Sequence, residues 1–164
     1  MVLNIVFTTC AAVVFSSAAD AQETIAYSRP VYTQQQTDPT PPIKATIAEF
    51  KKLKFLEGNW RGTGYKTPFF ESYRFVNDST IESFTSDDAS FAKLKPGSRI
   101  VLRNGSIYSE DNGQARWAVT RIDKDGYRFT AINRPGFFVW KGVNAKEWTA
   151  QLGNGTVYRM YRSK

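Results

Sequence analysis

The sequence contains no histidine, and its one cysteine, Cys10, lies close to the N-terminus. Without histidine, the protein cannot form a Ser-His triad, a histidine general base, a histidine-ligated haem or a common zinc site. Beyond Cys10 there is no thiol to form a disulfide, act as a nucleophile or bind a metal. We therefore expect no cofactor and no metal, and we predict that the protein is not an enzyme.

Lysine and arginine are absent from residues 1–21, which are otherwise typical of a secretory signal peptide. Residues 2–15 are mostly apolar, and residues 19–21 (Ala-Asp-Ala) supply the small-x-small pattern of a cleavage site. Cleavage there predicts Gln22 as the mature start and a periplasmic or secreted protein. The competing interpretation is an uncleaved anchor, since only the α-amino group adds positive charge. A spanning helix needs about 20 apolar residues, so we predict no transmembrane segment in the mature chain.

Periodic apolar residues are scarce in residues 22–42, which are rich in proline and glutamine. Such a segment buries too little apolar surface to offset the entropy lost on ordering. We predict a disordered linker over 22–42 and one folded domain over 43–164.

Acidic residues are outnumbered throughout the mature chain. Removing the leader takes away one acid, Asp20, and leaves 22 basic against 14 acidic residues, a net charge of +8. In an exported protein we expect no nucleic acid as partner, and anionic lipid, envelope polysaccharide or an acidic protein instead. A soluble surface with excess basic residues is the simpler interpretation.

One helix is predicted ahead of the strands. Thr40 followed by Pro41 is typical of a helix start, with threonine as the N-cap and proline at the first helical position. Apolar residues then recur at helical spacing, which predicts a short amphipathic helix over about 42–53. These residues are Ile43, Ile47, Phe50 and Leu53.

From residue 59 onward, apolar and polar residues alternate with the period of a β-strand. Asn104-Gly105 and Asn112-Gly113 are strong hairpin signals, because type I′ turns need positive φ. One longer connection covers 87–97. Sequential hairpins predict an all-β fold, a single antiparallel up-and-down β-barrel of about 8–10 strands with one short N-terminal helix, rather than a sandwich. The predicted strands cover 59–66, 69–77, 80–86, 98–103, 106–110, 115–122, 127–133, 137–142, 146–152 and 155–162.

Residues 54–62, with the sequence KFLEGNWRG, carry a resemblance to a known family. A Gly-x-Trp at the first strand, after a short helix and before a meander, resembles the lipocalin-like barrels of the calycin superfamily, in particular bacterial domains of unknown function. It implies that Gly58 and Trp60 form the barrel floor. It also implies that an arginine near the end of the chain stacks over the tryptophan, for which we assign Arg159, with Arg162 as the alternative. Nitrobindin-type barrels begin similarly, but they hold haem through a histidine, so that activity is not implied.

The strand predicted over 69–77 poses the clearest polar question, because Glu71, Tyr73 and Phe75 share one face. If this face points inward, a carboxyl group lies in an aromatic interior, and burial would raise its pKa. The carboxyl group could pair internally, anchor a ligand or act as an acid or base. The residues predicted to bind the ligand are Glu71, Tyr73, Phe75, Trp117, Tyr127, Phe129, Phe138, Trp140, Trp148 and Tyr158.

These features predict an exported lipocalin-like protein that binds a small hydrophobic or aromatic ligand, or a lipid acyl chain, in an aromatic-lined barrel. Two alternatives stay open. A barrel packed solid by its own side chains could serve as an interaction module for an envelope partner or as an enzyme inhibitor. A histidine-free isomerase or lyase could use the carboxyl and tyrosine groups.

Overall fold

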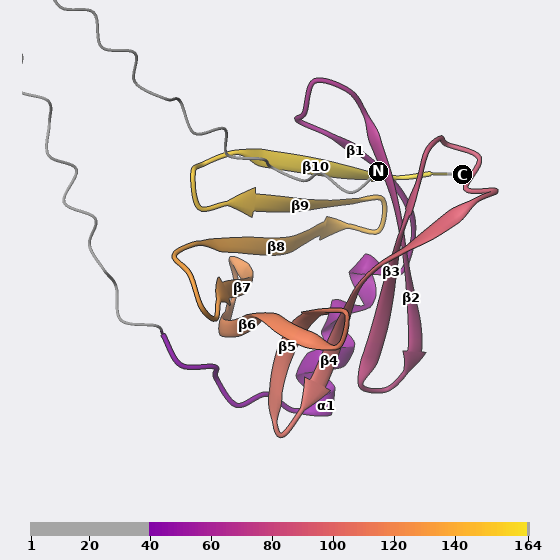
Figure 1. Ribbon diagram of the computed structural model, residues 1–164. Coiled ribbons are helices and arrows are strands. Elements are labelled where there is room, and N and C mark those ends of the chain that lie inside the picture. Colours follow the sequence, from indigo (N-terminus) through magenta and orange to yellow (C-terminus); the bar gives the residue numbers. More distant parts are fainter. Residues whose placement is uncertain (1–39, 164) are drawn as a thin grey trace, which may run out of the picture. The chain divides into compact units, whose positions relative to one another are not determined.

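The structure of the protein is a computed structural model that describes residues 40–163. The predicted signal peptide lies outside the described residues, as do residues 22–39 of the predicted linker. Ten strands form a closed antiparallel barrel in which each strand pairs with the next and β10 closes onto β1 (Figure 1). This confirms the predicted fold class. The strands are β1 (Gly58–Thr63), β2 (Phe69–Asn77), β3 (Thr80–Ser86), β4 (Leu94–Arg103), β5 (Ser106–Asp111), β6 (Gln114–Asp123), β7 (Gly126–Ala131), β8 (Phe137–Asn144), β9 (Glu147–Leu152) and β10 (Val157–Arg162).

The strand bounds lie close to the predicted ones because turn residues end the strands. Asn104 and Asn112 have φ values of 52° and 49°, and the glycine after each also has a positive φ, as a type I′ turn requires. The largest difference is β4, which begins at Leu94 rather than at residue 98. Pro96 pairs with Phe84 of β3, so the connection between these strands shortens to residues 87–93.

The N-terminal helix begins later than predicted. α1 covers Ile47–Lys51, and Thr46 rather than Thr40 is its N-cap. The Thr46 hydroxyl accepts from the Glu49 N–H at 3.2 Å, and the Glu49 carboxylate accepts from the Thr46 N–H at 2.7 Å, which forms a capping box. The preceding segment is held against the barrel, where the Ile43 N–H donates to the Val119 carbonyl at 3.0 Å.

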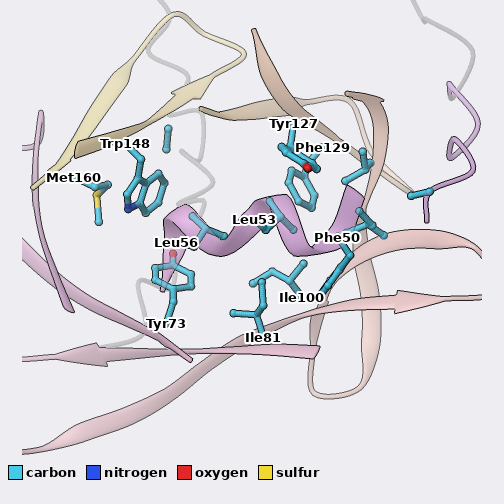
Figure 2. Packing of buried hydrophobic residues seen from close by; sticks show 14 of the residues in the cluster. Phe50, Leu53, Leu56, Tyr73, Ile81, Ile100, Tyr127, Phe129, Trp148 and Met160 are labelled. Carbon is cyan, nitrogen blue, oxygen red and sulfur yellow. The ribbon is translucent and has the colours of Figure 1, made fainter. Parts of the chain in front are cut away.

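The helix continues as a 3₁₀ segment, η1 (Lys52–Leu56), and fills one half of the barrel interior. Phe50, Leu53 and Leu56 are fully buried. They are three residues apart, the period that aligns side chains in one row on a 3₁₀-helix. In Figure 2 this row lies among side chains from opposite walls of the barrel, with Tyr127 and Phe129 on one side and Ile81 and Ile100 on the other.

Trp60 lies at the base of this packed half. Its side chain is fully buried, its indole Nε1 donates to the Leu56 carbonyl at 2.5 Å, and its ring meets Trp148 edge-on at 6.1 Å between centroids. The Arg162 guanidinium lies 4.4 Å from the Trp60 ring centroid. A Cβ at Gly58 would overlap this guanidinium, so glycine is needed there for the arginine to pass.

The assignment of Arg159 to this stacking position was wrong. Arg159 lies on the outer face of β10, where its Nη1 donates to Glu147 Oε1 at 2.9 Å. The reason is register: Trp60 pairs with Arg162 across β1 and β10, and side chains of paired residues point to the same face of the sheet.

Candidate ligand-binding cavity

An open cavity of about 640 Å³ occupies the end of the barrel away from the helix. Its lining residues come from the starts of β2, β4, β6 and β8 and the ends of β3 and β5, which meet at one rim of an antiparallel barrel. Ile81, Ile107 and Tyr127, which are buried with the helix, come from the opposite strand ends. The barrel therefore has a packed half and a hollow half.

Aromatic side chains form the floor and one wall of the cavity. Tyr73 and Trp140 meet edge-on at 6.1 Å between ring centroids, and both pack on Trp148 below them. The ring centroid of Phe138 lies 5.1 Å from that of Trp140 and 5.0 Å from that of Trp117. These contacts extend the aromatic wall toward the rim. Because the floor residues rest on the packed half, the shape of the cavity is set before any ligand enters.

Glu71 carries a carboxyl group that contacts the aromatic floor. It neighbours Tyr73 on the inward face of β2, and the Tyr73 hydroxyl donates to Glu71 Oε2 at 2.7 Å. The side chain keeps some exposed area toward the cavity, while protein surrounds it elsewhere. Within residues 40–163 the carboxyl group forms no ion pair, and Oε1 accepts no hydrogen bond. A ligand group in the cavity would find this oxygen free.

Burial raises the pKa of Glu71, and the hydrogen bond from Tyr73 offsets only part of this effect. Burial also raises the pKa of Tyr73, as does the neighbouring carboxylate, so the phenol keeps its proton at neutral pH. The pair therefore presents one fixed O–H···O bond and one carboxyl oxygen with an unmet capacity to accept. The free oxygen faces the open cavity, where a ligand donor or water can reach it.

Glu71→Gln is expected to raise the melting temperature at about pH 8 and to leave it nearly unchanged at about pH 4. Because the folded-state pKa is raised, the unfolded chain loses this proton first as the pH rises, which favours unfolding. Below the ordinary pKa both states hold the proton and the penalty disappears. Glutamine keeps an oxygen for the Tyr73 bond. Calorimetric scans of both proteins measure the difference, and a variant no more stable than wild type at about pH 8 would contradict the burial.

Polar side chains occupy the remaining wall and the rim. The Ser83 hydroxyl donates to the Ser98 carbonyl at 2.8 Å, which joins β3 to β4 at the cavity. Glu110 Oε1 lies 2.9 Å from Arg103 Nη1, so its charge is already paired. Other polar residues that line the cavity are Thr85, Ser109, Asp111, Arg116, Asn133 and Arg134.

Arg134, from the turn between β7 and β8, places its guanidinium 4.9 Å from the Trp117 ring centroid. Sequence reasoning missed it because a turn residue has no periodicity to assign it to a face. Ser83 and Thr85 could have been predicted from the sequence, because they alternate with Ile81 along β3 and therefore share its inward face.

The structure brings half of the predicted ligand residues together at the cavity and places the others elsewhere. Those that line it are Glu71, Tyr73, Trp117, Phe138 and Trp140. Trp148 and Phe129 are fully buried beneath the floor, and the Tyr127 hydroxyl donates to the Glu49 carbonyl of the helix at 2.6 Å. These residues lie outside the cavity lining because the helix occupies their half of the interior.

Two further predicted residues also lie away from the cavity lining. Phe75 meets Phe50 of the helix edge-on at 5.9 Å between ring centroids. Tyr158 meets Phe69 edge-on at 5.6 Å, and the Phe69 ring fills the space that Gly62 leaves open on β1. The absence of a side chain at Gly62 therefore makes room for the Phe69 ring.

Comparison with known proteins finds no family model, no curated protein and no solved structure that matches the chain. The ten-strand antiparallel barrel is compatible with a lipocalin-like fold. Across residues 40–163, no helix is long and apolar enough to cross a membrane, and no cluster of three or more acidic side chains is placed to hold a metal ion. The cavity is therefore the feature of the described residues that points to a function.

Proposed function

We propose that the protein is an exported, lipocalin-like carrier that binds a small hydrophobic or aromatic ligand in the barrel cavity. The observation that supports this most strongly is the combination of a hollow of about 640 Å³ with an aromatic floor and one free carboxyl oxygen. Small-molecule sites are typically concave and apolar, with few polar groups that fix the ligand's orientation. The cavity is concave, and its aromatic floor and wall face a polar wall and rim that could fix a ligand's orientation.

The packed half of the barrel supports the same proposal. Phe50, Leu53 and Leu56 of the helix are fully buried beneath the cavity floor, so the floor cannot collapse to fill the hollow. A site that is rigid before binding loses less conformational entropy when the ligand arrives. The interaction-module alternative is favoured by a barrel packed solid at both ends, which this barrel is not.

The proposal is tested with a fluorescent aromatic dye such as 1-aminoanthracene. We expect saturable binding at one site per chain and displacement of the dye by other apolar molecules. Native mass spectrometry of freshly purified protein checks for a ligand carried through purification. We propose binding without turnover, so a bound ligand is expected to be recovered unchanged. The absence of saturable dye binding, together with the absence of a retained ligand, would refute the proposal and favour the interaction module.

Export is the part of the proposal that rests on residues 1–21. If the leader is removed, the protein recovered from the periplasm or medium begins at Gln22. Intact-mass measurement of the expressed protein tests this directly. A mass that includes residues 1–21 would instead favour the uncleaved anchor.

A further inference from the structure

We infer that the cavity selects organic ammonium ions: small molecules that join a protonated amine or quaternary ammonium group to an aromatic or short apolar body. This inference rests on the proposed function and names the ligand class for the same site. It follows from the position of Glu71 relative to the aromatic floor and from the distribution of charge around the cavity.

Glu71 offers a ligand one carboxyl oxygen that no protein group in the described part of the chain occupies. Glu71 Oε2 is occupied by the Tyr73 hydroxyl at 2.7 Å, while Oε1 has no partner within residues 40–163. A carboxylate accepts hydrogen bonds and donates none. A ligand ammonium group supplies both the donor that Oε1 lacks and the opposite charge that burial of this group requires.

The aromatic rings of the cavity favour a cation as well. Tyr73, Trp140 and Phe138 line the same cavity as the carboxyl group, and the Tyr73 hydroxyl contacts it directly. The face of an aromatic ring carries negative electrostatic potential, and it attracts ammonium and guanidinium ions within about 6 Å. The protein already uses this attraction at the rim, where the Arg134 guanidinium lies 4.9 Å from the Trp117 ring centroid.

The other charged groups at the cavity do not neutralise Glu71. Five ionisable residues besides Tyr73 line it, namely Glu71, Glu110, Asp111, Arg116 and Arg134. Glu110 is paired with Arg103, Arg134 stacks on Trp117, and Arg116 and Asp111 lie at the β5–β6 hairpin on the rim. Once Glu71 is ionised, a ligand anion at the floor would meet an uncompensated carboxylate, and a neutral ligand would leave that charge unpaired.

Ammonium binding is coupled to ionisation of Glu71. Burial holds its pKa above the ordinary value, and a cation beside it favours the ionised form. Affinity for an amine that stays protonated is therefore expected to increase as the pH rises through the raised pKa of Glu71.

Isothermal titration with three probes of similar size and different charge tests the inference: 2-phenylethylamine, 3-phenylpropanol and 3-phenylpropanoate. At neutral pH the amine is expected to bind at least about tenfold more tightly than the alcohol or the carboxylate. Glu71→Gln is expected to remove this preference. The matched control Glu82→Gln makes the same change at a carboxylate that pairs with Arg99 outside the cavity lining, and it is expected to preserve the preference.

Each outcome separates the inference from the proposed function. Dye binding without a preference for the amine, or a preference that survives Glu71→Gln, overturns the inference and leaves the carrier proposal standing. The absence of binding by the dye and by all three probes overturns both. If Glu71→Gln fails to fold, the affinities of the wild-type protein for the three probes decide the inference on their own.

Discussion

Replacing Phe50 with alanine is expected to lower the free energy of unfolding by about 3–5 kcal/mol. Phe50 is fully buried in the barrel and packs edge-on against Phe75 at 5.9 Å between ring centroids. Removing the ring leaves a cavity, because the strands that surround it in the closed barrel cannot all move inward to fill it. A loss of this size is a large share of the stability of about 5–15 kcal/mol that is usual for a domain. Urea denaturation followed by tryptophan fluorescence measures it.

Ile47 on the same helix provides the matched control. Its side chain is 52% exposed, so Ile47→Ala is expected to change the free energy of unfolding by less than about 0.5 kcal/mol. If both alanine substitutions lowered the free energy of unfolding by similar small amounts, the helix would not be packed in the barrel. The division into a packed and a hollow half would then be wrong.

Replacing Thr85 with tryptophan is expected to weaken ligand binding by at least about tenfold, which corresponds to ~1.4 kcal/mol. Thr85 lines the cavity near the end of β3, and its side chain is exposed there. The larger ring would occupy the mouth without entering the packed half, so the melting temperature should change little. Titration with 1-aminoanthracene measures the affinity, and thermal unfolding checks the fold.

Val76 offers a control for the added ring. It lies on the outer face of β2 and is 53% exposed, so Val76→Trp adds the same group outside the barrel. We expect this variant to bind the dye as wild type does. Equal loss of binding in both variants would point to a site on the outer surface, and unchanged binding in Thr85→Trp would show that the ligand does not use the cavity.

The barrel was predictable because its signals are local. The turn pairs at Asn104 and Asn112 fix where strands end, and alternation along strands such as β7 indicates which side chains share a face. With short connections throughout, an antiparallel meander is the simplest way to pair such strands. None of these steps needs knowledge of distant parts of the chain.

The helix start was mispredicted because two signals competed. Thr40-Pro41 is a valid local start, but residues 43–45 form backbone hydrogen bonds to β6 and the β4–β5 turn instead. The capping box of Thr46 and Glu49 was readable from the sequence as Thr-x-x-Glu. The change from α1 to the 3₁₀ segment over Lys52–Leu56 had no such signal, because apolar residues three apart are also typical of an α-helix.

Half of the residues predicted to bind a ligand line the cavity. Alternation correctly paired Glu71 with Tyr73 on an inward face, but it cannot tell how deep along the barrel an inward residue lies. Tyr127 and Trp140 both point inward and pair across β7 and β8, yet one packs on the helix and the other lines the cavity. The stacking arginine depended on the register between the first and last strands, which no local pattern encodes.

The indole N–H signals of the four tryptophans test the central claim most directly. Trp117 and Trp140 line the cavity, whereas Trp60 and Trp148 are buried in the packed half. In ¹⁵N-correlated NMR spectra, assigned with single Trp→Phe variants, addition of a saturating ligand is expected to shift the signals of Trp117 and Trp140 most and to leave Trp60 in place. A shift at Trp60 as large as that at Trp140, or no shift at either cavity tryptophan, would contradict a ligand site in the hollow half of the barrel.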